Sequence, residues 1–293
     1  MVTSKIVGGL GNQMFQYAIG KRMADDLKQD FVIDIEDFKT YRRHYALDRF
    51  QITTPSLDPA KAASFRKYEG RVSLWRSLEG LKPIVNRSYR LEALEHYFKY
   101  HPEYIQPHPK GKDVYLNGYW QHPDYFAPIR NTLLSEFRLT PQQQIQDPQL
   151  LRILSENETV AVHFRRGEDQ LTKSLYGVPP MSYYAQAVRT IAERRGSARL
   201  HLLIFSNDIE WVKQNFQPDM PTTYVSGAFG LNDEQEFELM ARSTHQVIAN
   251  STFSWWAAWL NDNPGRIVVA PTTWLNDPRF DTRGLYLKDW LIF

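Results

Sequence analysis

Apolar and polar residues alternate with two different periods near the N-terminus of the chain. A short apolar segment at residues 5–7 precedes a glycine-rich turn, a helical pattern covers about 14–27, and an apolar run follows at 31–35. A strand, a helix and a second strand in this order form a βαβ unit, and such units predict a parallel sheet.

The alternation is most regular in the second half of the chain. Val160, Val162 and Phe164 alternate with Ala161 and His163, which predicts a buried strand over 159–165. Further strands are predicted at 200–208, 246–250 and 266–272. Helices are predicted at about 182–195 and at 254–260. Between these two lies a third helix, whose apolar face consists of Phe237, Met240, Ala241 and Thr244. Four buried strands separated by helices predict a doubly wound α/β domain.

The region between these two parts is less regular. Residues 38–112 mix Pro, Arg and Tyr without a clear period, whereas 113–121 shows a strand pattern and 125–137 a helical one. A polar run at 139–149 contains three consecutive glutamines and two prolines, which is typical of a surface crossing between domains. We therefore expect an N-terminal, acceptor-side lobe at 1–146 and a C-terminal, nucleotide-binding lobe at 147–293.

Composition narrows the classes of function. The chain has 293 residues with 35 Lys plus Arg against 33 Asp plus Glu, so it lacks the basic field of a bulk nucleic-acid binder, and any anion site must be local. It has no cysteine, which excludes disulfides and thiol catalysis. No stretch approaches the ~20 apolar residues of a membrane span. We expect a cytoplasmic protein with at most peripheral membrane contact.

Polar residues follow three of the predicted strands in the second half. The clusters are Arg165, Arg166 and Gly167 after the first strand, Ser206, Asn207 and Asp208 after the second, and Asn250, Ser251, Thr252, Phe253 and Ser254 after the third. Ligands of doubly wound sheets bind outside the carboxyl ends of the strands. We therefore expect the three clusters to converge on one site.

Diphosphate recognition is the chemistry that these clusters share. An arginine fork donates paired hydrogen bonds to phosphate oxygens, and backbone N–H groups at the start of a helix after Asn250 would complete an anion site. The carboxylate of Asp208 suits the paired N–H donors of guanine. Taken singly, an arginine pair is typical of a surface ion pair, and Ser, Asn or Thr before a helix is typical of an N-cap. Three clusters at one sheet edge favour the site.

The glycine-rich turn near the N-terminus, GGLGNQ, has neither the G-x-G-x-x-G spacing nor a Walker lysine. Gly9 and Gly11 nevertheless permit close approach of a ligand to the backbone, and Asn12 and Gln13 offer donors and acceptors. The alternative is a tight turn with these side chains in solvent. The eight histidines show no i, i+4 pairing, so we expect no metal and no cofactor, with the arginine pair stabilising a leaving group.

Four blocks carry a family resemblance: GGLGNQMFQYA (8–18), HFRRGED (163–169), FSND (205–208) and ANSTFSWWAAWL (249–260). The chain resembles the bacterial α-1,2-fucosyltransferases of glycosyltransferase family 11. The resemblance implies a two-lobed GT-B-type fold with Rossmann-like sheets. It also implies an inverting, metal-independent transfer of fucose from GDP-fucose to the 2-hydroxyl of a terminal galactoside, such as a lactose-like acceptor or an O-antigen unit.

The resemblance also implies roles for single residues. In related fucosyltransferases the first arginine of an H-x-R-R motif grips the diphosphate, which corresponds to Arg165, with His163 and Arg166 alongside. An acidic residue after the next strand reads guanine, which corresponds to Asp208. The family usually has Asp directly after R-R-G, whereas this chain has Glu168 followed by Asp169.

The sequence offers several candidates for the general base that would deprotonate the acceptor hydroxyl. Asp34 ends the second predicted strand in the lobe expected to hold the acceptor, so it is one candidate, with a helix cap or loop anchor as its structural alternative. Glu168 and Asp169 are the others, although they could simply pair with the neighbouring arginines. A dissociative step would need no strong base. Two other functions are possible for the whole protein. It could be a GDP-sugar-binding module without transfer activity, or a scaffold that binds partners through its tyrosine-rich middle region.

Overall fold

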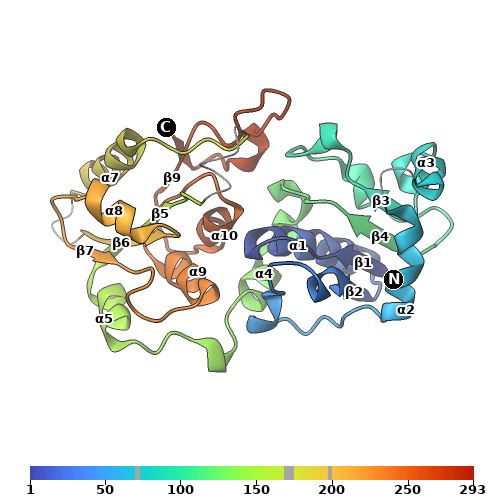
Figure 1. Ribbon diagram of the computed structural model, residues 1–293, viewed down its shortest axis with the longest axis horizontal. Coiled ribbons are helices and arrows are strands. Elements are labelled where there is room, and N and C mark those ends of the chain that lie inside the picture. Colours follow the sequence, from blue (N-terminus) through green and yellow to red (C-terminus); the bar gives the residue numbers. More distant parts are fainter. Residues whose placement is uncertain (70–72, 168–174, 197–199) are drawn as a thin grey trace. The chain divides into compact units, whose positions relative to one another are not determined.

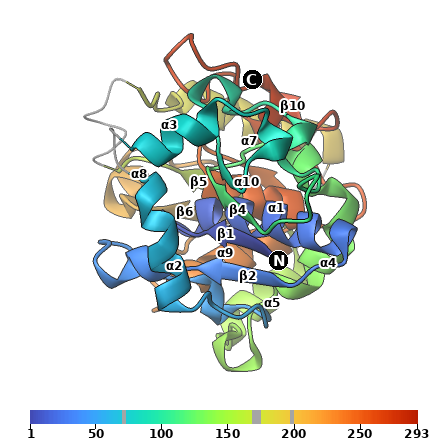
Figure 2. The same cartoon turned by 90° about the vertical axis from the view of Figure 1, so that its right-hand side faces the viewer.

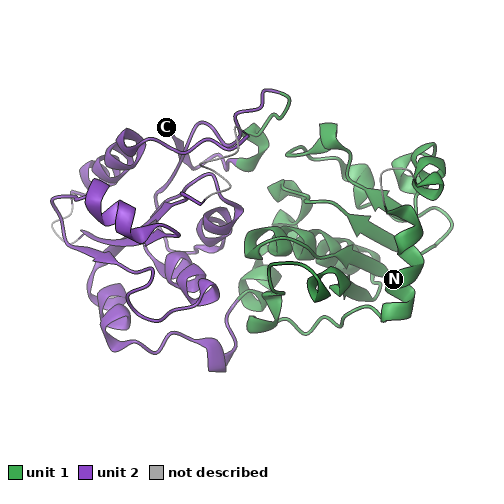
Figure 3. Cartoon of the chain, in the orientation of Figure 1, with its two compact units in different colours: residues 1–137, 279–285 green, residues 138–278, 286–293 purple. Residues whose placement is uncertain are grey.

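The computed structural model describes residues 1–69, 73–167, 175–196 and 200–293. These residues form two compact units, shown in two colours in Figure 3. The first unit comprises Met1–Phe137 and Arg279–Leu285, and the second comprises Arg138–Pro278 and Tyr286–Phe293. The segment around Phe280 belongs to the first unit because its ring packs on Tyr97 and Phe98 there. Each unit contains one sheet (Figure 1).

The sheet of the first unit has the strand order β2-β1-β4-β3, and all neighbours run parallel. Its elements are β1 (Val2–Lys5), α1 (Leu10–Leu27), β2 (Phe31–Asp34), α2 (Pro59–Phe65), α3 (Leu74–Gly80), β3 (Tyr89–Leu91), β4 (Val114–Asn117) and α4 (Arg130–Glu136), with several 3₁₀ turns between them. The predicted βαβ unit at the start of the chain is confirmed. The irregular region 38–112 contains two short helices, α2 and α3, and the strand β3.

Several element boundaries in this unit differ from the sequence prediction. β1 ends at Lys5, and α1 begins at Leu10 rather than near residue 14, because Gly8 turns the chain at φ +89° and Gly9 is the N-cap of the helix. The strand predicted over 113–121 ends at Asn117, since Trp120 adopts a left-handed φ of +55°. Of the helix predicted over 125–137, only Arg130–Glu136 is α-helical, after a 3₁₀ turn at Ala127–Ile129 that contains a proline.

The second unit has a six-stranded parallel sheet with the order β10-β9-β8-β5-β6-β7. Its elements are α5 (Pro148–Glu156), β5 (Glu158–Phe164), α7 (Met181–Arg195), β6 (Leu200–Ser206), α8 (Ile209–Asn215), β7 (Thr222–Tyr224), α9 (Asp233–Arg242), β8 (His245–Val247), α10 (Thr252–Leu260), β9 (Val268–Ala270) and β10 (Leu291–Ile292). The four predicted strands are confirmed. The two edge strands β7 and β10 were missed, because two or three residues are too few for a period.

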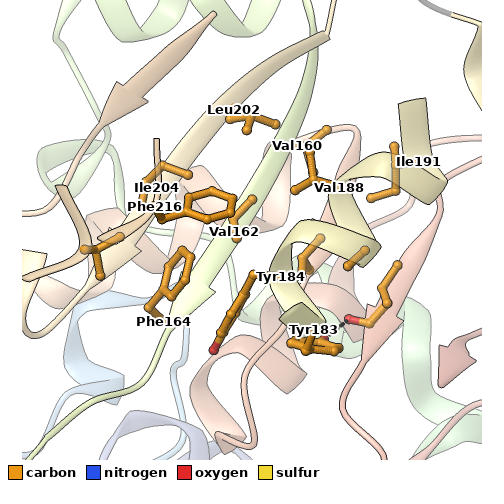
Figure 4. Packing of buried hydrophobic residues seen from close by; sticks show 14 of the residues in the cluster. Val160, Val162, Phe164, Tyr183, Tyr184, Val188, Ile191, Leu202, Ile204 and Phe216 are labelled. Atoms are coloured by element: carbon orange, nitrogen blue, oxygen red, sulfur yellow. Dashed lines mark hydrogen bonds between the residues drawn. The ribbon is translucent and has the colours of Figure 1, made fainter. Parts of the chain in front are cut away.

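The predicted alternation along β5 is also confirmed. Val160, Val162 and Phe164 join one hydrophobic cluster with residues of α7, where Phe164 stacks on Tyr184 with ring centroids 3.9 Å apart (Figure 4). His163 lies in contact with Phe253 of α10, with ring centroids 5.8 Å apart. Both faces of the strand are therefore covered, as is usual for a parallel sheet.

The order of the strands contains one switch point. From β5 the chain proceeds through β6 to β7 on one side, whereas β8, β9 and β10 follow one another on the other side. β5 and β8 are neighbours at the reversal, and ligands of such sheets bind outside the carboxyl ends of the strands at this place. The segments that follow β5 and β8 are those that carry Arg165 and Asn250.

Candidate functional site

The end of β5 is tied to the end of β6 through a glycine. A Cβ atom at Gly167 would lie 2.7 Å from Asn207 Nδ2, so glycine lets the amide of Asn207 approach this backbone closely; the 3.7 Å to Arg165 Cζ is an ordinary contact. The ring of Tyr184 stacks on Phe164, the last residue of β5, and so fixes the strand end to α7. Two of the three predicted clusters are therefore neighbours, as the strand order requires.

The two adjacent arginines have different surroundings. The guanidinium carbon of Arg166 lies 3.2 Å from the ring centroid of Trp211 on α8, and its Nε lies 3.6 Å from Asp208 Oδ2. The Arg166 backbone N–H donates to Asn207 Oδ1 over 2.9 Å. These contacts hold the connections after β5 and β6 together. Donor binding by Arg166 and Asn207 stays a prediction.

Ser206 and Asp208, at the turn after β6, differ in exposure. The Asp208 side chain is 39% exposed and is accessible to a ligand beside its pairing with Arg166. Its backbone N–H donates to Ser206 Oγ over 3.0 Å, and the Ser206 N–H donates to Ser226 Oγ, also over 3.0 Å. Ser206 is therefore engaged in shaping the turn, while the carboxylate of Asp208 is the group that faces outward.

His163 is a neutral imidazole in this fold. It is buried, and burial together with the nearby Arg165 lowers the pKa of His163 to about 3. Its Nδ1 atom is buried without a hydrogen-bond partner among the described residues. The ring of His163 packs against Phe253 and so joins the end of β5 to the start of α10.

The third cluster divides into structural and exposed members. Asn250 Nδ2 donates to the carbonyls of Gly177 (2.7 Å) and Trp274 (3.1 Å), and Ser254 Oγ donates back to Ser251 O over 3.4 Å. Asn250 and Ser254 are thus occupied in holding the backbone. Ser251 is the N-cap of α10 but makes no capping side-chain bond within the described part of the chain, and Thr252 is half-buried. The first turn of α10 can therefore present N–H groups to an anion.

A carboxyl group that the sequence analysis missed lies close to these turns. Ser226 Oγ donates to Glu236 Oε2 over 2.8 Å, and burial raises the pKa of Glu236 to about 7. Glu236 is four residues before Met240 on the apolar face of α9, next to Phe237. A carboxylate inside an apolar helical stripe is the signal that would have found it.

The glycine-rich turn of the first unit is better described as a helix start. Gly9 is the N-cap of α1 without a side-chain cap, so Gly11, Asn12 and Gln13 lie in the first turn. Gln13 donates to Gly8 O (2.9 Å) and His44 O (3.0 Å) and accepts from Ala46 N–H (2.9 Å), so its amide is engaged in holding the neighbouring loop.

Asn12 and an unpredicted arginine complete this helix start. Asn12 Oδ1 accepts from Gln121 Nε2 over 2.9 Å, across to the segment after β4. A Cβ atom at Gly9 would lie 3.6 Å from Arg43 Nη1, so a guanidinium lies beside the N-terminus of α1. The irregular region 38–112 held no periodic signal for Arg43. Ligand binding by Gly9, Gly11, Asn12 and Gln13 stays a prediction.

The candidate base Asp34 lies at the end of β2 and is 3% exposed. Its Oδ2 accepts from the Tyr115 hydroxyl over 2.7 Å, and its Oδ1 accepts from the Glu36 backbone N–H over 3.0 Å. Both oxygens serve as anchors for the strand end, so the structural alternative has concrete contacts, and the role of a base stays a prediction. Glu168 and Asp169 lie outside the described residues.

Two general properties of the described chain bear on function. No helix in residues 1–69, 73–167, 175–196 or 200–293 combines the length and apolar character needed to cross a membrane. Within the same ranges, no three His, Cys, Asp or Glu side chains gather as a set of metal ligands. Metal independence stays a prediction that an assay must test.

Comparison with known proteins decides the family. A sequence model of the family described as Glycosyl transferase family 11 matches residues 1–293. The chain belongs to glycosyltransferase family 11. The resemblance of the four sequence blocks is thereby confirmed, and the chain is a glycosyltransferase.

Curated relatives are all named as glycosyltransferases, and two of them name different sugars. The chain is 29% identical to an alpha-1,2-colitosyltransferase of Escherichia coli, over 94% of this chain and 92% of the relative. It is 30% identical to the O-antigen biosynthesis glycosyltransferase WbnK of Escherichia coli, over 92% and 94%. It is 24% identical to galactoside alpha-(1,2)-fucosyltransferase 2 of Hylobates lar, over 99% and 78%.

Solved structures show the fold. Fucosyltransferase NodZ from Bradyrhizobium matches with a TM-score of 0.50 at 15% identity, over 90% of this chain and 96% of NodZ. Arabidopsis thaliana FUT1, solved in complex with GDP, matches with a TM-score of 0.52 at 12% identity, over 91% and 69%. The predicted α/β fold of GT-B type is confirmed by these likenesses and by the two parallel sheets.

Proposed function

We propose that the chain transfers L-fucose from GDP-fucose, with inversion, to the 2-hydroxyl of a terminal galactoside in glycan or O-antigen biosynthesis. The observation that carries the proposal is the position of Arg165. It follows β5 at the switch point of the second sheet, beside His163 and near the start of α10. A guanidinium and the N–H groups of a helix start together suit a diphosphate.

The donor base is proposed to bind at the neighbouring turn after β6. The outward carboxylate of Asp208 offers two acceptor oxygens, which match the paired N–H groups on the edge of guanine. A similar structure supports a guanine nucleotide, because Arabidopsis FUT1 was solved with GDP.

In the proposed step, the acceptor oxygen forms a bond to the anomeric carbon while the bond from that carbon to the diphosphate oxygen breaks. The electron pair of the broken bond goes to GDP, and the hydroxyl proton leaves to a base or to solvent. Arg165 stabilises the charge that develops on the departing diphosphate. Removing one such preorganised contact typically costs about 10²–10³ in rate, or roughly 3–4 kcal/mol.

A colitosyl donor is the second candidate, because one relative is named an alpha-1,2-colitosyltransferase. Colitose is fucose without the 3-hydroxyl, so the two donors differ by one hydrogen-bonding group. The colitosyl and galactoside fucosyl relatives are both named for an α-1,2 linkage, which supports transfer to a 2-hydroxyl with either sugar.

The test is a transfer assay with GDP-fucose and GDP-colitose, each with lactose and with galactose-terminated oligosaccharides, in the presence of EDTA. Proton NMR of the product would give the linkage and the anomeric configuration. We expect a fucosylated product with GDP release, and a loss of about 10²–10³ for Arg165→Ala. Arg152→Ala is the matched control, since Arg152 is 75% exposed on α5 and pairs with Glu156.

Each outcome assigns one function. Product from GDP-colitose alone would select the colitosyl reading. Saturable binding of GDP-fucose without product from any galactoside would select the binding module, and failure to bind GDP would leave only the scaffold. More than about a tenth of the parent rate in Arg165→Ala, against the expected loss, would contradict the role of this arginine.

A further inference from the structure

Helix α3 of the first unit exposes its apolar side chains. Leu74, Trp75, Leu78 and Leu81 are 68%, 53%, 46% and 84% exposed. They make up four of the nine large hydrophobic residues that are exposed among the described residues, although they come from eight consecutive positions. We call these four side chains the α3 patch. Figures 1 and 2 show α3 at the margin of its unit.

The burial pattern of α3 is the reverse of that of an ordinary surface helix. Its buried members are polar: Ser73, which accepts the Arg76 N–H at the N-cap, and Glu79, which is 6% exposed and pairs with Lys82 over 2.5 Å. A surface helix usually turns its apolar stripe to the core and its charges to water. The fold of the unit therefore does not account for the leucines.

The patch forms one surface on the helix. Leu74, Leu78 and Leu81 are spaced i, i+4 and i+7, which places them on one side, and Trp75 is adjacent. A contiguous exposed apolar surface marks an interaction site, whereas single exposed residues need no explanation.

Positive charge surrounds the α3 patch. Lys67 Nζ lies 5.0 Å from the centroid of the Trp75 ring. Arg87 donates to the carbonyls of Gly80 and Lys82, each over 2.8 Å, which fixes a guanidinium at the end of the helix. Residues 73–89 contain three basic side chains and one acidic one, a net +2, which equals the net charge of the whole chain.

We propose that the α3 patch docks the chain on the surface of a bilayer that contains anionic phospholipids. Leu and Trp side chains enter the boundary between headgroups and acyl chains, while Lys and Arg contact lipid phosphates. The seven residues of α3 are far fewer than the ~20 needed to span a bilayer, so the helix lies in the plane of the surface.

The charge also selects the membrane over a second copy of the chain. A symmetric dimer through the α3 patch would bring the same surface of both copies together, and so would oppose a net +2 to another +2. An anionic bilayer neutralises this charge.

The experiment is co-sedimentation with vesicles of phosphatidylcholine alone or with phosphatidylglycerol. We expect binding to the anionic vesicles that weakens with added salt, because salt screens exposed charges. Leu78→Ser with Leu81→Ser should lower the partition coefficient at least about tenfold, since each exposed leucine loses its transfer into the lipid. Leu94→Ser is the matched control, because Leu94 is 54% exposed outside α3. All substituted side chains are exposed, and circular dichroism would check the fold.

Anionic binding that the double variant loses and Leu94→Ser keeps supports the proposal. The proposal is overturned by an absence of binding to any vesicle, by equal losses in the double variant and Leu94→Ser, or by a concentration-dependent dimer that the double variant abolishes without vesicle binding. These measurements use no sugar donor, so their failure is distinct from a failure of the proposed transferase.

Discussion

Glu92 is a buried carboxyl group whose protonation should make the stability of the chain depend on pH. It follows β3 and is 4% exposed, and its Oε2 accepts the backbone N–H groups of Tyr119 (2.6 Å) and Trp120 (3.0 Å). Burial raises the pKa of Glu92 to about 7, although the two N–H donors act in the opposite direction. The contacts also hold Trp120 at its left-handed φ of +55°.

The sign and size of the effect follow from linkage. Below the unfolded pKa of 4.5, both states are protonated and Glu92 adds no pH dependence. Between 4.5 and about 7 the unfolded chain releases its proton while the folded chain keeps it, so stability falls as pH rises. At about 1.36 kcal/mol per pKa unit, the loss between pH 4.5 and 8 approaches 3 kcal/mol.

Glu92→Gln isolates this contribution. The glutamine carbonyl can accept the same two N–H groups but cannot ionise, so the variant should lack this part of the pH dependence. We would measure the free energy of unfolding in urea by tryptophan fluorescence at pH 5, 6, 7 and 8 for both proteins. The variant should gain up to about 3 kcal/mol over the parent as pH rises.

Two results would refute this reasoning. A difference between parent and Glu92→Gln that stays constant from pH 5 to 8 would mean that Glu92 is already ionised in the folded chain. A parent that gains stability over the variant as pH rises would mean that the N–H donors outweigh burial. In Glu92→Ala, by contrast, both backbone donors lose their acceptor, and the buried Trp120 N–H alone should cost about 1–3 kcal/mol at any pH.

Two predictions concern the proposed site. Asp208→Asn should weaken GDP about 10- to 100-fold while UDP is little affected, since a charged acceptor for guanine is lost; competition by GDP and UDP against the donor measures this, and unchanged competition would contradict the guanine role. Asp34→Asn should lower kcat with little change in the KM for GDP-fucose if Asp34 is the base. Tyr115→Phe is its control, because it removes the 2.7 Å hydrogen bond to Asp34 and keeps the carboxylate; equal losses of kcat and Tm in both variants would make Asp34 an anchor.

The parts of the fold that the sequence predicts are those in which local pattern and topology agree. β5, β6, β8 and β9 are short buried runs separated by helices, so their period and their order suffice to predict a parallel sheet. The strand ends then follow, because parallel strands share one carboxyl edge. This is why the segments at Arg165, Asp208 and Asn250 were expected together from residues far apart in the chain, and why they lie on neighbouring strands or their connections.

Side-chain roles were harder to predict because the deciding partner comes from another element. Arg166 and Arg165 are adjacent in sequence, but Trp211 on α8 stacks on Arg166 and so distinguishes it. Nothing in the sequence motif indicates a partner for Gln13, but its side-chain amide donates to the carbonyl of His44. Asp34 meets Tyr115, which is 81 residues away. Periodicity is evaluated within windows of up to about 18 residues, so it gives no information on contacts between residues so far apart.

The contrast between α7 and α3 shows what periodicity can and cannot establish. In α7, Tyr184, Val188 and Ile191 at i, i+4 and i+7 pack into the core beside β5. In α3 and at its C-cap, Leu74, Leu78 and Leu81 have the same spacing and remain exposed. Spacing therefore defines a face of a helix, and the partner that covers the face follows from the surroundings. For α7 that partner is a sheet, whereas for α3 the surrounding positive charge makes an anionic bilayer the partner that fits.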